Sequence, residues 1–183
     1  MEKKKWDQLI AGCIKDDRCS QKDLYKAYYG FAMRVCLRYA NNRDDAAKIM
    51  NEGFLHVFRR IAAFKNEEFL LTFISSVMVT TSLRYYRSSL NNAEAWGGPA
   101  STQSLLANET TMYEEQDHFD IIGALGQLPL VCRIIFNLFV IDGFSHHEIA
   151  LLLNTSQADS QTYLIKARSK LREILFGEAL IAI

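Results

Sequence analysis

The sequence is poor in the residues that build disulfide scaffolds and zinc sites. It has four cysteines among 183 residues, and no two of them form a C-x-x-C pair or match a zinc-ligand spacing. We therefore expect ordinary reduced thiols, three of them facing a core, at Cys13, Cys19, Cys36 and Cys132.

Motifs that carry catalysis are also absent. The chain has no glycine-rich phosphate loop, no G-x-S-x-G nucleophile and no carboxylate–histidine spacing suited to a metal. The run His146-His147-Glu148 resembles half of an H-E-x-x-H zinc motif, but Leu151 stands where the second ligand would be. We therefore expect a protein that is not an enzyme and that binds no metal and no cofactor.

Long apolar runs are missing as well. No run approaches the roughly 20 apolar residues that cross a bilayer. The charged start of the chain, Met1 to Trp6, lacks the apolar stretch of a secretory signal. These absences favour a cytoplasmic protein with no membrane insertion.

Charge is present but unevenly distributed. The net charge is zero, yet residues 1–90 carry 16 Lys and Arg against 10 Asp and Glu. Residues 91–118 carry five acids and no base, and residues 119–183 carry five bases and six acids. A basic first part can approach a polyanion, whereas the last part has no net electrostatic attraction to one.

A break in the pattern near Ser88 to Asp117 divides the chain. This stretch is acidic, contains Asn, Gly, Ser, Thr and Gln, and has no sustained apolar period, which is typical of a solvated linker. On both sides the apolar residues recur at steps of three and four, which is helical spacing. The sequence thus predicts an all-α protein of two small helical domains, 1–88 and 118–183, joined by a flexible acidic linker, 89–117.

The first domain is expected to contain four helices. Trp6 to Cys13 indicates a short leading helix, and Gln21–Tyr39 and Asp45–Ile61 each carry an apolar stripe. The fourth segment, Phe69–Arg87, contains β-branched residues typical of a strand. Its apolar residues nevertheless recur at steps of four, so we expect a helix there as well.

The second domain is expected to contain four short helices, the last two arranged as a helix-turn-helix. Pro129 follows the first helix and can stand in the first turn of the next. Ser145 and Glu148 have the spacing of a capping box, and Ser156 is a second N-cap, with Asp159 in the first turn. Two short helices around a tight polar turn are the sequence form of a helix-turn-helix. The last helix is expected to bury Ser160, Leu164, Ala167, Leu171 and Ile174.

Several motifs are similar to those of the extracytoplasmic-function group of bacterial sigma factors. The clearest stretch runs from Leu128 to Arg172 and contains L-P-x3-R, D-G-F-S-x-x-E-I-A-x-L-L and K-A-R-x-K-L-R. Upstream, D-D-A-A-K-I-M-N-E-G-F-L-x-V-F-R-R resembles that family's polymerase-binding helix, and a later helix ends in L-R-Y-Y-R. The resemblance implies a sigma factor that binds core RNA polymerase and directs it to promoter DNA. A flexible linker also permits an anti-sigma factor as a further partner.

The resemblance assigns roles to three groups of residues. Polymerase binding would fall on Lys48, Asn51, Glu52, Leu55 and Arg59. Melting of the downstream promoter element would use cations and rings that hold unpaired bases, at Lys65, Asn66, Arg84, Tyr85, Tyr86 and Arg87. Reading of the upstream element in the major groove would fall on Gln157, Asp159, Gln161, Thr162, Lys166 and Arg168.

The sequence departs from the family's pattern at several positions. Lys48 and Asn51 stand where an acid and Gln are usual. The usual Trp, Asn and Asp of the melting helix correspond to Leu70, Val77 and Thr81 in one register, or to Phe73, Thr80 and Arg84 in another. In the recognition helix, Asp159-Ser160-Gln161-Thr162-Tyr163 stands where the family usually has T-V-K-S-R. This replacement removes two cations and adds one anion.

These departures leave a second hypothesis open. It is a degenerate sigma-like protein that binds polymerase or a regulatory partner without reading promoter DNA. Structural roles also stay open for single residues: Lys166 to Arg172 as a solvated helix face, Tyr85 and Tyr86 as packing aromatics, and Asp159 as a stabiliser of the helix end.

Overall fold

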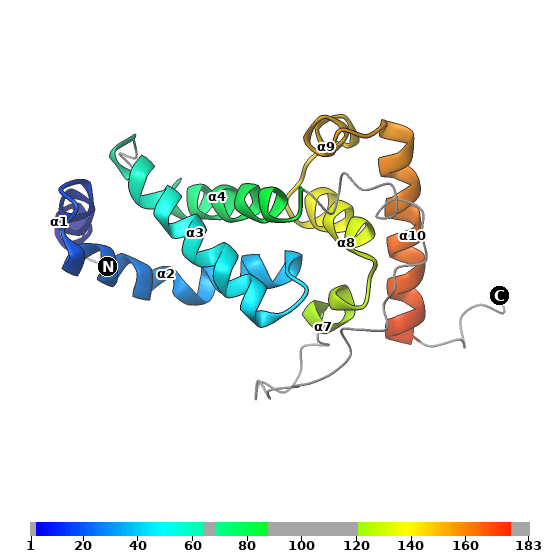
Figure 1. Ribbon diagram of the computed structural model, residues 1–183, viewed down its shortest axis with the longest axis horizontal. Coiled ribbons are helices and arrows are strands. Elements are labelled where there is room, and N and C mark those ends of the chain that lie inside the picture. Colours follow the sequence, from blue (N-terminus) through cyan, green and yellow to red (C-terminus); the bar gives the residue numbers. More distant parts are fainter. Residues whose placement is uncertain (1–2, 64–68, 88–120, 177–183) are drawn as a thin grey trace. The chain divides into compact units, whose positions relative to one another are not determined.

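The computed structural model describes residues 3–63, 69–87 and 121–176, and within these ranges it contains helices and no strand. The expected all-α class is thus confirmed. The chain divides into two compact units, Met1–Tyr86 and Arg87–Ile183 (Figure 1). The expected linker, 89–117, lies outside the described residues, so the domain bounds given above stay predictions.

The first unit has the four helices that the periodicity indicates. They are α1 (Lys3–Ile14), α2 (Arg18–Tyr39), α3 (Arg43–Arg60), which ends in the short 3-10 turn η1 (Ile61–Ala63), and α4 (Leu70–Tyr85). Side-chain caps explain where two of them begin, because Asp17 accepts a hydrogen bond from the Ser20 N–H and Asn42 accepts one from the Asp45 N–H.

The core of the first unit lies where α2, α3 and α4 pack against one another, with α1 against α2 and η1 (Figure 1). Fully buried side chains include Leu24, Tyr39 and Phe54. Gly53 permits a close approach of α3 to α4, since a Cβ at this position would lie 2.5 Å from Sδ of Met78. A larger residue there would have to displace the end of the Met78 side chain.

Helix α4 contains the β-branched residues that favour a strand in isolation. Their hydroxyl groups find partners inside the helix: Thr80 donates to the Ser76 carbonyl at 2.7 Å, and Thr81 donates to the Val77 carbonyl at 2.7 Å. Hydrogen bonds of this kind satisfy the buried hydroxyl of Thr81 without any partner on another helix. The four-residue spacing of the apolar side chains therefore prevails over the local preference for a strand.

The second unit contains α7 (Ile121–Gly126), α8 (Leu130–Phe136), which continues into the π-helical turn η4 (Asn137–Ile141), then α9 (His146–Leu153) and α10 (Gln157–Phe176). Helix α10 packs against α7, α8 and α9. Figure 1 shows α9 beside the start of α10 and α7 beside its end. The expected set of four helices, the last two in a helix-turn-helix, is thus present.

The boundaries of α8 differ slightly from expectation. Pro129 occupies the N-cap position, directly before the first residue of the helix, and not a position inside its first turn. At the other end the Asp142 N–H donates to the Asn137 carbonyl at 2.9 Å, which is the five-residue step of a π turn. Gly143 follows with a φ of 78° and ends the element.

The burial of the cysteines agrees with the expectation from the sequence. Cys13, Cys36 and Cys132 are buried, as expected for three of the four, and Cys19 is exposed. Burial raises the pKa of Cys13 to about 11 and that of Cys36 to about 12, so both are protonated near neutral pH. Among the described residues, no helix combines the length and the apolar character needed to cross a membrane.

Candidate nucleic-acid and polymerase interfaces

The helix-turn-helix is built from local capping contacts. Ser145 and Glu148 form the complete capping box expected at the start of α9. The helix ends at Asn154, which adopts the left-handed conformation with a φ of 52°. Helix α10 begins where the Asp159 N–H donates to the Ser156 hydroxyl at 3.0 Å, so the second expected N-cap is also present.

Helix α10 has one buried and one exposed face. The buried positions are those expected, namely Ser160, Leu164, Ala167 and Leu171, while Ile174 is only half-buried. All six side chains expected to read the upstream element are exposed: Gln157, Asp159, Gln161, Thr162, Lys166 and Arg168. Exposure of the outer face near the start of the second helix is what insertion into a major groove requires.

Asp159 is engaged in the helix cap. Its carboxylate accepts a hydrogen bond from the Ser156 hydroxyl at 2.7 Å and a longer one, at 3.4 Å, from the Thr155 hydroxyl. The Ser156 hydrogen bond holds the pKa of Asp159 below its usual value. These contacts support the role of Asp159 as a stabiliser of the helix end, the alternative to base reading that the sequence left open.

Ser160 has a partner that the sequence pattern did not reveal. It is fully buried, and its hydroxyl lies 2.9 Å from Nδ1 of His146 on α9. The His146 ring also stacks on Phe139, with ring centroids 4.3 Å apart. Ser160 therefore replaces an apolar residue by a satisfied hydrogen bond between the two helices. The adjacent pair, His147 and Gln157, makes a similar contact at 2.8 Å on the exposed side.

Four exposed cations follow along α10, and two of them have partners within the helix. The Lys166 ammonium lies 5.1 Å from the centre of the Tyr163 ring, in cation–π geometry. Lys170 donates to Glu173 at 2.6 Å. Tyr163, which stands where the resembling family has a cation, thus fixes a neighbouring cation instead.

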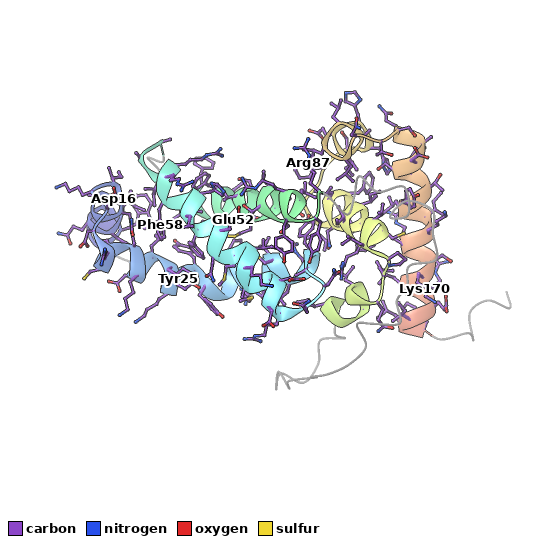
Figure 2. The ribbon with its side chains drawn as sticks, viewed as in Figure 1. Asp16, Tyr25, Glu52, Phe58, Arg87 and Lys170 are labelled. Atoms are coloured by element: carbon purple, nitrogen blue, oxygen red, sulfur yellow. The ribbon has the colours of Figure 1, made fainter. Side chains whose placement is uncertain are left out.

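The five residues expected to bind polymerase are all exposed on α3. Three have side-chain contacts in the unit: Asn51 accepts from the Tyr25 hydroxyl at 3.0 Å, Lys48 lies 3.5 Å from Asp45, and Glu52 accepts from Arg84. Figure 2 shows Glu52 on α3 at the side bordered by α4. Leu55 is 56% exposed, so its side chain is available for a protein contact.

The end of α4 carries the residues expected to hold unpaired bases. Arg84 donates to Glu52 at 2.8 Å and to Nε2 of His56 at 2.6 Å. About half of each side chain of the Arg84–Glu52 pair is exposed, 50% and 48%, and such a pair is weak enough to be exchanged for a phosphate. Arg87 lies two residues after α4 and is exposed. Tyr85 is exposed and donates its hydroxyl to Asp45 at 2.8 Å, which raises the pKa of that hydroxyl.

Tyr86 is a correction to the expected set. Its ring is only 5% exposed and packs edge-on against Tyr85. Its hydroxyl accepts from the Asn41 N–H at 3.0 Å and donates to Asp45 at 3.4 Å. The ring is therefore a packing aromatic at the junction of α2, α3 and α4 and does not offer a face to a base.

The two trios of α4 that the sequence left open differ in their exposure. Leu70, Val77 and Thr81 are buried. In the other register, Thr80 and Arg84 are exposed and Phe73 is half-buried. The outward side of α4 thus carries the second trio. Two further expected residues, Lys65 and Asn66, lie outside the described part of the chain.

No group of three or more metal-binding side chains occurs within residues 3–63, 69–87 and 121–176. The candidate interfaces are, in the first unit, the exposed face of α3 and the cationic end of α4 and, in the second unit, the exposed face of α10.

Comparisons with known proteins match both units. The family model described as sigma-70 region 2 matches residues 24–90, and the model described as sigma-70, region 4 matches residues 118–171. The chain is 17% identical to the RNA polymerase sigma-H factor of Pseudomonas aeruginosa over 178 residues, 92% of each chain.

A solved structure is also similar. It is the co-crystal structure of the sigma factor RpoE with the anti-sigma factor NepR from Bartonella quintana. The match has a TM-score of 0.50 and 14% identity, and it covers 84% of this chain and 95% of that one. At 14% identity, the match supports a similarity of fold alone.

Proposed function

We propose that the two units of this chain divide the work of a sigma factor. The chain belongs to the sigma-70 family, within its extracytoplasmic-function group. It therefore binds core RNA polymerase and directs promoter-specific initiation of transcription. In this division the second unit reads the upstream promoter element as duplex DNA. The first unit binds polymerase through α3 and holds melted DNA at the end of α4.

The observation that carries the proposal for the second unit is the two-sided structure of α10. Its inner face is packed, and its outer face presents Gln157, Gln161 and Thr162 to solvent near the start of the helix. Gln can pair with adenine, and Thr can contact several base edges. Lys166 and Arg168, one or two turns later, suit contacts with phosphates.

The proposal for the first unit rests on two neighbouring surfaces. The exposed face of α3 around Leu55 suits a protein partner, and Arg84 and Tyr85, with Arg87 directly after the unit, suit a nucleic acid. Glu52 belongs to the first surface and Arg84 to the second, and the two are paired at 2.8 Å. Engagement of Glu52 by polymerase would release Arg84 for DNA. Lys65 and Asn66 complete the proposed contacts with the downstream element.

The proposal also covers the cellular location of the chain and a further protein partner. We place the chain in the cytoplasm and leave catalysis to polymerase. Adjacent exposed leucines on α9, Leu151 and Leu152, offer an apolar surface to a protein. An anti-sigma factor is the additional partner that we propose for it.

A second candidate function has one observation in its favour. Because Asp159 is held in the cap and the recognition helix lacks two of the usual cations, a sigma-like protein that binds polymerase without reading DNA is the alternative to test.

The experiment that separates the two candidates begins with mapping of transcripts after expression of the chain. The mapped promoters are then transcribed in vitro by core polymerase with and without the chain. We expect new start sites that depend on the chain and weaken with salt. Polymerase binding without any chain-dependent start site would favour the second candidate instead.

A further inference from the structure

The exposed hydrogen bond between His147 and Gln157 joins the two helices of the helix-turn-helix at the point where DNA would be read. We infer that His147, which lies outside the recognition helix, positions the Gln157 side chain and thereby helps to determine which base pair is preferred in the upstream element. This inference rests on the proposed function of the second unit.

The contact has a defined geometry. Gln157 is the first residue of α10, and His147 is the second residue of α9. Nε2 of Gln157 lies 2.8 Å from Nδ1 of His147. An amide nitrogen can only donate, so the His147 ring accepts through Nδ1. Gln157, one of the residues that we assign to base reading, is thus tied by its side chain to the supporting helix α9.

The hydrogen bond leaves Gln157 able to read a base. Its amide group has two N–H bonds and one oxygen. His147 uses one N–H, so the second N–H and the oxygen stay available, which are the two groups that a bidentate contact with adenine requires. Because one N–H is bonded to His147, rotation of the amide group is restricted before DNA arrives. The recognition group is therefore partly ordered in the free protein.

The neighbouring histidine has a different role, which provides an internal comparison. His146 contacts buried Ser160 and stacks on Phe139, so it holds the two helices together. His147 is exposed, and its contact reaches a side chain that faces solvent. A change at His146 should weaken the whole unit, whereas a change at His147 should act through Gln157 alone.

The consequence is a measurable change in base preference. Ordering a long side chain on binding costs enough to change affinity by roughly twofold to tenfold. We expect H147A to reduce the preference at one base pair of the upstream element by about this factor. Preferences at the other base pairs and affinity for polymerase should stay as in the wild type, since alanine at an exposed helical position preserves α9.

The experiment uses the full chain with core polymerase and promoter templates in which the upstream element is randomised. Transcripts are sequenced to obtain a preference at each base pair for the wild type, H147A, Q157A and the double variant. We expect H147A and Q157A to affect the same base pair and the double variant to show no greater effect than Q157A alone. H147N should retain the preference, because its amide oxygen can take the place of Nδ1.

Two controls separate this inference from a structural role and from the proposed function. Q161A should change a different base pair, and its effect should add to that of H147A. H146A should lower transcription evenly across sequences. If the wild type selects particular sequences and H147A selects the same ones with equal strength, the positioning role is wrong. If the wild type selects none, the proposed reading of DNA is what fails.

Discussion

Tyr85 and Tyr86 are adjacent in the sequence but differ in their surroundings. Tyr86 is buried, with its hydroxyl bonded to Asn41 and Asp45, while Tyr85 is exposed. We expect Tyr86→Phe to lower the free energy of unfolding by about 1 kcal/mol, the usual net contribution of a hydrogen bond, with little effect on open-complex formation. Tyr85→Ala should instead weaken open-complex formation by about 1–3 kcal/mol if its ring stacks on a base.

The measurements for this tyrosine pair are urea unfolding of the chain and permanganate footprinting of the melted promoter. Tyr85→Phe is the matched control, because it keeps the ring and removes only the hydroxyl that bonds Asp45. An effect of Tyr86→Phe on melting that exceeds its effect on stability would return Tyr86 to the DNA-contacting set.

Arg84 and Arg87 are the cations at the end of α4 for which we propose contact with DNA. We expect R84Q and R87Q to reduce open-complex formation and to leave polymerase affinity near that of the wild type, since the half-exposed Arg84–Glu52 pair that R84Q also removes contributes little. The pairing of Arg84 with Glu52 supplies a comparison. E52A should weaken polymerase binding and remove the carboxylate partner of Arg84, which keeps its contact with His56. Equal weakening of polymerase binding and melting in R84Q would contradict the assignment.

At the scale of single residues, the sequence predicted which α10 side chains face outward but not what they touch. Helical spacing determines the exposed face, so the six outward residues could be predicted. Arg84 and Glu52 are 32 residues apart in the sequence, and His146 and Ser160 are 14 apart. A single sequence carries no signal for such pairs. Burial of Tyr86 was missed for the same reason, because it depends on Asn41 and Asp45.

The two helices of the helix-turn-helix are each stabilised by a carboxylate at the start. The Ser145 N–H holds the pKa of Glu148 below its ordinary value of 4.5, and the Ser156 hydroxyl holds that of Asp159 below 3.8. A lowered pKa stabilises the folded state above the ordinary value, and this contribution disappears as the pH falls through the lower pKa of the folded state. We expect the amides of α9 and α10 to exchange equally slowly, after correction for intrinsic rates, from neutral pH down to 4.5, and to become less protected below it.

Hydrogen exchange of the full chain as a function of pH measures this effect. The variant E148Q/D159N removes both carboxylates, so its protection should be lower at neutral pH and should decrease less on acidification. An unchanged decrease in this variant would mean that other carboxylates cause the acid instability of the second unit.

At the scale of elements, the sequence predicted each described helix and the two N-caps of the helix-turn-helix. Capping signals are local, so Ser145, Glu148 and Ser156 could be placed from a few neighbouring residues. The register of α4 against the family's pattern was not decided, because neither trio restores the usual Trp, Asn and Asp. The structure adds only the burial of the two trios: Val77 is buried in the unit, and Phe73 is half-buried.

At the scale of the whole molecule, the uneven charge of the two units indicates how they share the binding of DNA. Residues 1–90 are basic, and residues 119–183 carry five bases and six acids. Attraction to DNA at long range would thus come from the first unit and from polymerase, and the second unit would add short-range contacts. This division is a prediction from charge alone, because the net charge of each segment is given directly by its residues.

A salt titration measures how many cations of the second unit contact DNA phosphates. Polymerase contributes its own phosphate contacts, but these cancel when variants are compared on one promoter. Removal of one phosphate contact lowers the salt slope of binding by about one, so K166Q/R168Q should lower it by about two and weaken binding evenly across sequences. K170Q is the matched control, because Lys170 is paired with Glu173 at 2.6 Å and should change the slope less. An unchanged slope in K166Q/R168Q would assign those cations to the solvated face of α10, and the second unit would then bind DNA through the start of that helix alone.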